Sequence, residues 1–138
     1  MEKVDRTHWE RAELFEFFSA VSHPFYSVTF RVDVTNLYRY VKERHLSFYY
    51  AMGYLVTDAV NSVKNFRCAI RDGEVWLLDE RIPSLTDLKP GSEQFHIVTL
   101  PKVGGIAEFC ASAQARSAAQ KTLLDQDEEN DNLIYISC

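Results

Sequence analysis

Residues 47–63 read SFYYAMGYLVTDAVNSV and residues 67–78 read RCAIRDGEVWLL, and these two stretches decide the fold class. Apolar side chains recur in the first stretch at steps of four, three, four and four residues, which predicts an amphipathic helix. They are Phe48, Met52, Leu55, Ala59 and Val63. In the second stretch two apolar runs flank Asp72-Gly73, a dipeptide that favours the tight turn of a β-hairpin. A helix that leads into a hairpin predicts a fold in which helices cover a sheet.

Three further elements are expected upstream of this helix. Residues 9–20 mix aromatic side chains with charges and indicate a short helix or an extended arm. Residues 26–34 alternate strictly between apolar and polar side chains, which is the period of a β-strand. Residues 35–45 predict a second helix, with Thr35 or Asn36 as its N-cap.

The segments downstream of the hairpin predict two strands and one more helix. Residues 81–93 contain two prolines and are expected to be a connection, while residues 94–100 alternate as a strand. A helix is expected near 106–124, followed by an acidic loop at 125–132 whose simplest interpretation is a solvated surface. Residues 132–138, NLIYISC, read as a buried strand. The whole chain is therefore expected to form one α/β domain, with a mixed β-sheet covered by helices.

Composition and charge exclude several classes of protein. The 138 residues are 46% hydrophobic and 25% charged, which is typical of a globular domain. A net charge of −5 and the lack of a Lys/Arg stripe argue against a nucleic-acid partner. The N-terminus lacks the pattern of a signal peptide, and no run of about eighteen apolar residues could form a transmembrane helix. The odd number of cysteines, without metal-like spacing, indicates reduced thiols in a cytoplasmic protein.

Isolated motifs give little sign of catalysis. The four histidines stand at positions 8, 23, 45 and 96, with no pair at the spacing of metal ligands. The sequence contains neither G-x-S-x-G nor a P-loop, and no metal is expected. Aromatic residues make up 13% of the chain, which fits either a well-packed core or a flat apolar ligand pocket.

The order of the aromatic blocks is more informative than any one of them. The chain contains, in this order, the blocks HWERAELFEFF, FYSVTFRVDVTNL, SFYYAMGYLVTDAVN, FRCAIRDGEVWLLD, SEQF and LIYIS. In order and spacing they resemble the chloramphenicol acetyltransferase family, from about Thr7 to the C-terminus.

The resemblance implies a trimeric, coenzyme A-dependent acyltransferase of the kind that confers antibiotic resistance, with active sites between subunits. Such an enzyme moves an acetyl group from acetyl-CoA to a hydroxyl of chloramphenicol. In the family a histidine acts as general base on this hydroxyl, and a serine stabilises the oxyanion that develops. By the same resemblance, Ser137 is the expected oxyanion serine. Arg11 matches an arginine that organises the site through an aspartate near the catalytic histidine, and the alternative is a surface arginine.

Other positions of the family's site carry over in the same way. The expected substrate-binding residues are Phe17, Phe18, Tyr26, Phe95 and Ile97. Tyr49 matches a tyrosine near the coenzyme, with Tyr50 in place of the proline that commonly follows it. Phe18 stands where the family often has tyrosine, and Tyr26, Phe95 and Ile97 are also compatible with plain core packing. If the carry-over holds, the phenylalanines and Ile97 converge in one pocket and Ser137 points toward a cleft.

One departure from the family pattern changes the functional expectation. The family's His-His-x-x-x-Asp-Gly signature is missing, because Asp72-Gly73 follows no histidine at that spacing. We therefore expect a truncated, N-terminal portion of such an enzyme that is inactive alone. The alternatives are a non-catalytic remnant that binds a ligand or self-associates through 132–138 or a neighbouring strand, and an enzyme in which His23 or His96 supplies the base.

Overall fold

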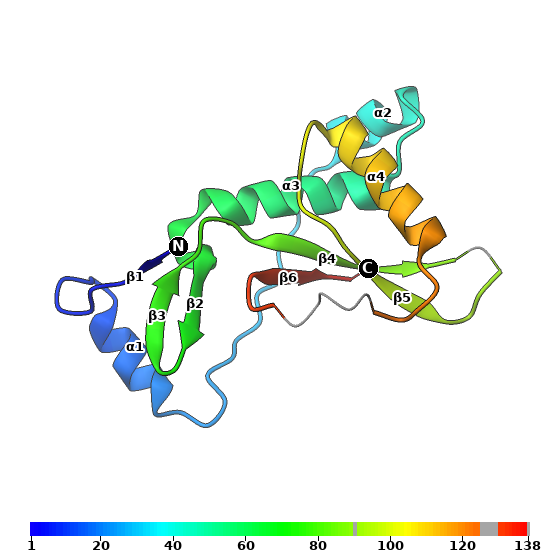
Figure 1. The fold of residues 1–138 in the computed structure, drawn as a ribbon. Helices are drawn as coiled ribbons and strands as arrows, with labels where there is room; N and C mark the ends of the chain where they lie inside the picture. The colour runs from blue at the N-terminus through cyan, green and yellow to red at the C-terminus, as the bar shows by residue number, and fades with distance from the viewer. Residues whose placement is uncertain (90, 125–129, 138) are drawn as a thin grey trace.

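The computed structural model describes residues 1–89, 91–124 and 130–137 and shows a mixed α/β architecture (Figure 1). In these residues the elements are β1 (Glu2–Lys3), α1 (Ala12–Ser19), α2 (Thr35–Glu43), α3 (Phe48–Ser62), the 3₁₀ helix η1 (Lys64–Arg67), β2 (Cys68–Arg71), β3 (Glu74–Leu77), β4 (Ile82–Leu88), β5 (Phe95–Thr99), α4 (Ile106–Ala119) and β6 (Leu133–Ile136). The expected fold class is confirmed.

The first sheet is antiparallel and has the order β1-β3-β2. Its β2–β3 hairpin is the one that the sequence predicts. Asp72 and Gly73 both have positive φ values, 52° and 75°, which is the backbone geometry that an Asp-Gly turn allows. Helix α1 lies beside this hairpin (Figure 1).

The second sheet is mixed and has the order β5-β4-β6. Strand β5 runs antiparallel to β4, whereas β6 runs parallel to it with Ser84 opposite Tyr135. The central strand β4 corrects the expectation of a connection at 81–93. Pro83 made a strand look improbable, but it lies just outside the β4–β5 register, so it removes no donor from the antiparallel ladder.

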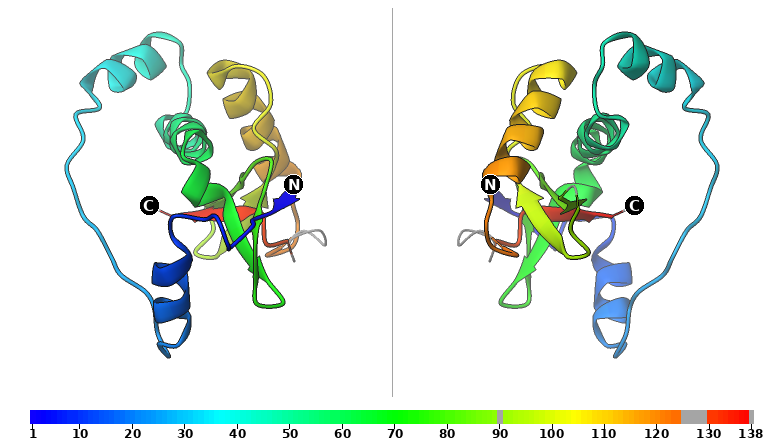
Figure 2. Two further views of the ribbon diagram at one scale, coloured as in Figure 1. Left: turned by 90° about the vertical axis from the view of Figure 1, so that its left-hand side faces the viewer. Right: turned by 90° about the vertical axis from the view of Figure 1, so that its right-hand side faces the viewer.

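Helices α3 and α4 cover one face of the second sheet and pack side by side (Figures 1 and 2). The core between them contains Ala51, Leu85, Val98 and Phe109, all fully buried. The predicted helix at 47–63 is confirmed, with the Ser47 hydroxyl as its N-cap accepting from the amide of Tyr50.

The buried face of α3 differs from the apolar stripe that suggested the helix. The residues of α3 that face the core are Tyr50, Ala51, Gly53 and Thr57. Leu55 and Ala59, which belong to the apolar stripe, are exposed. A Cβ atom on Gly53 would lie 2.8 Å from Leu85 Cδ2, so the close approach excludes a larger residue there.

Two other helix boundaries differ from the expected ones. The N-cap of α2 is Val34 rather than Thr35 or Asn36, and the Asp33 carboxylate accepts a hydrogen bond from the amide of Thr35. Helix α4 ends at Ala119, before an extended residue, instead of reaching 124. Most of the expected acidic loop at 125–132 lies outside the described residues.

The predicted strand at 26–34 is wrong. Within the described chain these residues lie in no sheet and no helix. They belong to a long connection between α1 and α2 that runs on the outside of the molecule, away from both sheets (Figure 2). The alternation of apolar and polar side chains predicted a strand, but a strand also requires a neighbouring strand to which its backbone is hydrogen-bonded.

Candidate functional site

An apolar hollow of about 410 Å³ lies between α1, the 3₁₀ helix, strand β2 and the start of the external connection. Its lining is mainly apolar and aromatic, as in small-molecule sites. The lining residues are Trp9, Arg11, Leu14, Phe15, Phe18, Ser19, Pro24, Tyr26, Asn65, Cys68 and Ile70. Three of the residues predicted for a site, Arg11, Phe18 and Tyr26, therefore meet here.

Helix α1 brings the aromatic wall of this hollow into place. Trp9 and Phe15 pack with ring centroids 5.9 Å apart, and Phe17 meets Phe18 edge-on at 5.2 Å. Phe17 itself does not line the hollow. The helix is short and buries none of its side chains, so its apolar residues are left available to a ligand or to another polypeptide.

The polar groups of the hollow are few. Arg11 is exposed, and its guanidinium makes no hydrogen bond or ion pair with any described residue. The Ser19 hydroxyl is already engaged, since it donates to the carbonyl of Phe15 at 2.6 Å. Cys68 is half-buried and has a weak contact of 3.8 Å from its Sγ to the carbonyl of Lys64. Among the described residues Arg11 is thus the one charged group in the lining, suited to a polar or anionic part of a ligand.

Phe95 and Ile97 lie elsewhere, on β5. Phe95 lines a second hollow of about 440 Å³ together with Lys89, His96 and Lys121. The backbone of Ile97 is held on both sides, because its amide donates to the carbonyl of Leu123 and its carbonyl accepts from Gln120 Nε2, each at 2.8 Å. The structure does not bring Phe95 and Phe18 into one pocket.

Tyr49 contacts the last residue of β6, next to Ser137. The Tyr49 hydroxyl lies 2.6 Å from the carbonyl oxygen of Thr86 and 3.1 Å from that of Ile136, and so links β4 to β6. Ser137 follows Ile136 directly and is exposed. Tyr49 therefore holds the strand end that carries the predicted oxyanion serine.

Sequence reasoning missed a buried polar cluster around Asp87. The carboxylate of Asp87 accepts hydrogen bonds from the hydroxyls of Tyr50 and Ser117, the latter at 2.5 Å. His96 Nε2 lies 2.8 Å from the Ser117 hydroxyl oxygen. His96 is thus linked through the Ser117 hydroxyl to the carboxylate of Asp87, a link that its neighbours in the sequence did not reveal. The four residues come from α3, β4, β5 and α4, so no spacing along the chain could have indicated the cluster.

The cluster shifts the acidity of its members. Burial raises the pKa of the Asp87 carboxyl, but the hydrogen bonds from Ser117 and Tyr50 outweigh this effect, so the net pKa is lowered. Burial and the Asp87 carboxylate both raise the pKa of the Tyr50 hydroxyl. Tyr50 therefore stays a donor and Asp87 stays an acceptor at neutral pH.

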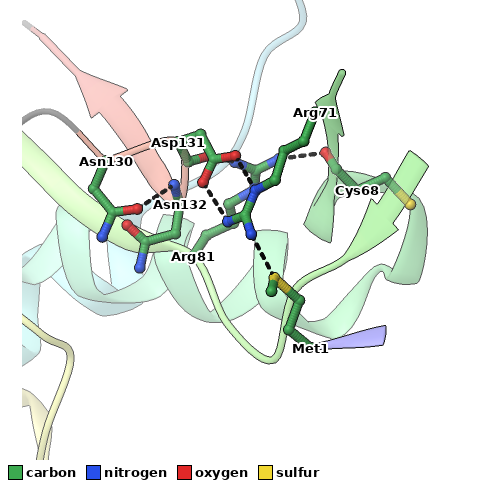
Figure 3. Close-up of polar contacts among 7 residues, drawn as sticks. All are labelled: Met1, Cys68, Arg71, Arg81, Asn130, Asp131 and Asn132. Carbon is green, nitrogen blue, oxygen red and sulfur yellow. Dashed lines mark hydrogen bonds and ion pairs between the residues drawn. The ribbon is translucent and has the colours of Figure 1, made fainter. Parts of the chain in front are cut away.

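A second polar cluster joins the two sheets (Figure 3). The guanidinium of Arg81, at the start of β4, donates to the carbonyls of Cys68 and Asp131, and its Nε donates to the carbonyl of Phe66 at 2.9 Å. Arg71 on β2 binds both carboxylate oxygens of Asp131 at 2.5 and 2.6 Å. This cluster connects Cys68, in the wall of the apolar hollow, to the segment that enters β6.

The remaining histidines and cysteines offer no further site in the described part of the chain. His23 is exposed and contacts only the hydroxyl of Ser22. Among the described residues no group of three or more His, Cys, Asp and Glu side chains could hold a metal ion. Nor is any described helix both long enough and apolar enough to cross a membrane.

Known proteins similar to this chain are chloramphenicol acetyltransferases. The profile of the family described as chloramphenicol acetyltransferase matches residues 1–138. A chloramphenicol acetyltransferase of Clostridium perfringens is 39% identical over 95 residues, and chloramphenicol acetyltransferase 3 of Escherichia coli is 30% identical over 138 residues. A solved chloramphenicol acetyltransferase structure shares the fold, with a TM-score of 0.83 and 24% identity.

The chain spans only part of these relatives. The matched stretch covers 68% of this chain but 44% of the Clostridium perfringens protein. For the Escherichia coli protein the shares are 98% of this chain and 65% of the relative. The structural match likewise covers 99% of this chain and 68% of the solved one.

Proposed function

Because the chain belongs to the chloramphenicol acetyltransferase family, we propose that it is part of an O-acetyltransferase that acetylates a small molecule with a free hydroxyl, such as chloramphenicol. The observation that carries this proposal is the apolar hollow, in which Arg11, Phe18 and Tyr26 meet. Its volume of about 410 Å³ is in the range of small-molecule sites. Acetyl-CoA is the proposed co-substrate, and no metal is needed for the transfer.

In the proposed reaction a general base removes the proton of the acceptor hydroxyl. The oxygen then attacks the thioester carbonyl of acetyl-CoA, a C–O bond forms, and the C–S bond breaks to release the coenzyme as a thiol. The Ser137 hydroxyl would donate to the oxyanion, a contact worth roughly 3–4 kcal/mol in comparable sites. Tyr49 supports this role through its contact with the carbonyl of Ile136.

The remaining site residues have separate roles in this proposal. Arg11 organises the polar end of the hollow, and Phe18 and Tyr26 contact the acceptor together with Phe17 at the rim. Phe95 and Ile97 lie on β5, away from this hollow, so they contribute only where a second subunit completes the site, as in a trimer. A cytoplasmic location agrees with the use of acetyl-CoA and with the free thiols of Cys68 and Cys110.

The polypeptide of 138 residues is not expected to catalyse this transfer by itself, because it contains no His-His-x-x-x-Asp-Gly signature. Incubation with acetyl-CoA and chloramphenicol should release no thiol above background, whereas an intact relative should release it. Thiol release by the purified chain would mean that another residue supplies the base. His96 would then be tested first, because it reaches Asp87 through Ser117.

Binding of the acceptor can be tested without catalysis. Calorimetric titration with chloramphenicol should give a measurable affinity that Phe18→Ala weakens about tenfold or more, because this ring forms part of the wall. Phe66→Ala is the matched control, since Phe66 is similarly exposed but does not line the hollow. Equal affinities for the two variants would contradict the proposed acceptor site.

The second candidate function is non-catalytic self-association. It is favoured by the segment at 26–34, which pairs with no described strand and whose apolar side chains Val28, Phe30 and Val32 are exposed. Absence of ligand binding together with a defined oligomer would support this candidate over the first.

A further inference from the structure

Two tyrosines stand side by side at the start of α3, and both hold β4. Tyr49 and Tyr50 lie in the first turn of the helix, and their ring centroids are 5.5 Å apart. The Tyr49 hydroxyl donates to the carbonyl of Thr86, and the Tyr50 hydroxyl donates to the carboxylate of Asp87. Two adjacent residues of α3 are thus bound to two adjacent residues of β4.

The Tyr49 hydroxyl lies where the parallel ladder of β4 and β6 ends. The last residue pair of this ladder is Leu85 and Ile136. Beyond that pair, the hydroxyl oxygen lies 2.6 Å from the carbonyl oxygen of Thr86 and 3.1 Å from that of Ile136. Both carbonyl oxygens are acceptors, so the hydroxyl between them sets the separation of the two strands just before Ser137.

The carboxylate that binds Tyr50 is itself fixed by further donors. One oxygen of Asp87 accepts from the Ser117 hydroxyl of α4 at 2.5 Å, and the other accepts from the amide of Leu88 at 2.8 Å. The single proton of the Ser117 hydroxyl is used in this bond, so Ser117 accepts from His96 Nε2 at 2.8 Å. Asp87 is therefore held from α4 and β5 and offers the Tyr50 hydroxyl an acceptor in one fixed place.

We propose that Tyr50 and Asp87 are positioning residues for Ser137. Their hydrogen bond fixes the first turn of α3 on β4, and this turn places the Tyr49 ring. The Tyr49 hydroxyl then fixes the end of β6, which Ser137 follows directly. An oxyanion donor acts only when it is held within about 0.5 Å of its productive place, so the contacts that orient its strand are part of the site.

The positioning role rests on the proposed function, in which Ser137 is the oxyanion donor. It adds two residues, Tyr50 and Asp87, that act through Tyr49 rather than on the reacting groups. The contacts that carry it lie inside the described chain, between α3, α4 and the second sheet, and Tyr50 is only 4% exposed. The role therefore does not depend on a second subunit.

Amide hydrogen exchange of the chain without ligand tests this role. In Tyr50→Phe, exchange should accelerate about tenfold at the Ile136 end of β6 and less than about twofold at the Leu133 end, where Arg81 still holds the preceding segment. Tyr54→Phe is the matched control, because its hydroxyl donates to the carbonyl of Gly104, outside the second sheet. A general loss of stability would accelerate both ends of β6 alike, and that result, or no acceleration at Ile136, would overturn the proposal.

Two further variants test the route of the effect. Asp87→Asn should accelerate exchange at the same end of β6, because its amide is a weaker acceptor for Tyr50 and brings a competing donor. In a Tyr49→Phe background, Tyr50→Phe should add less than about twofold at Ile136, because the contact that transmits its effect is already absent. The full tenfold effect in this background, or no effect of Asp87→Asn, would overturn the proposed route.

Hydrogen exchange is measured without a substrate, so it reports only on contacts inside the chain. Uniform exchange along β6 in Tyr50→Phe therefore overturns the positioning role and leaves the proposed transfer intact. Calorimetric titration with chloramphenicol tests the proposed function instead, and its failure leaves the exchange result unchanged.

Discussion

Asp87 shows at the residue scale how a half-buried charge is accommodated. Its carboxylate accepts from two buried hydroxyls and, through the other oxygen, from the amide of Leu88 at 2.8 Å. These donors replace the water that the carboxylate loses, which is why its pKa falls in spite of burial. The cluster also links α3, β4, β5 and α4.

Asp87→Asn should lower the free energy of unfolding at pH 7 by about 2–3 kcal/mol, because the amide presents an N–H₂ group to two hydroxyl donors. The lowered pKa of Asp87 means that its stabilisation is complete above the ordinary value of 3.8 and is lost as the pH falls through the folded-state pKa. The difference between wild type and variant, measured by urea unfolding, should therefore shrink as the pH falls below 3.8.

The control for this prediction is Asp58→Asn. The Asp58 side chain is 65% exposed and forms an ion pair of 2.9 Å with Lys102, and pairs with a solvent-exposed partner contribute little to stability. A pH-independent difference for Asp87→Asn, or an equal loss in the control, would show that the Asp87 carboxylate does not carry the effect.

Helix α3 shows at the scale of elements that periodicity and burial are separate properties. Its large apolar residues recur at helical spacing and correctly predict the helix. The face that meets the sheet is nevertheless formed by smaller residues, among them Ala51, Gly53 and Thr57, because helix and strand approach closely at Leu85. The residues that form the apolar stripe of α3 are therefore not the residues that pack against the sheet.

Gly53→Val should lower the free energy of unfolding by about 2 kcal/mol or more. The new Cβ would lie 2.8 Å from Leu85 Cδ2, and Leu85 is fully buried and cannot move aside. The exposed Ala59→Val in the same helix is the control and should cost about 0.5 kcal/mol, the loss in helix propensity. Equal melting temperatures of the two variants would contradict the close packing of α3 on β4.

Arg81 acts at the scale of the whole molecule, because its guanidinium joins the two sheets. It satisfies backbone carbonyls from the 3₁₀ helix, from β2 and from the segment before β6. Asn61 fixes the backbone of the same residue, with hydrogen bonds of 2.7 and 3.0 Å to its amide and carbonyl. The wall of the apolar hollow and the strand that leads to Ser137 are thus held by one side chain.

Arg81→Met should lower the free energy of unfolding by roughly 3 kcal/mol, because three carbonyls lose their donor while the apolar part of the side chain is kept. Amide hydrogen exchange should accelerate in both β2 and β6. Arg44→Met is the control, since Arg44 contacts only its own helical neighbourhood among the described residues, with Glu43 at 3.5 Å and the Tyr40 ring centroid at 4.0 Å. Faster exchange in one sheet alone would contradict the role of Arg81 as a link between them.

The candidate site was only partly predictable. The residues Arg11, Phe18 and Tyr26 come from neighbouring parts of the chain, and the fold does bring them into one hollow. Phe95 and Ile97 lie on β5, so their position depended on sheet order, which no local pattern contains. The cluster of Asp87, Ser117 and His96 was missed for the same reason.

The sequence by itself determined the family, the hairpin, the helices and the strand at β5, because each depends on the order or the spacing of residues along the chain. Only the tertiary structure decided that 82–88 is a central strand and that 26–34 has no partner within the described residues. The physical reason is that a strand is completed by hydrogen bonds to another strand, which can lie anywhere in the chain or in another molecule. Alternation of apolar and polar residues predicts that a segment can form a strand, whereas the tertiary structure decides whether another strand lies beside it.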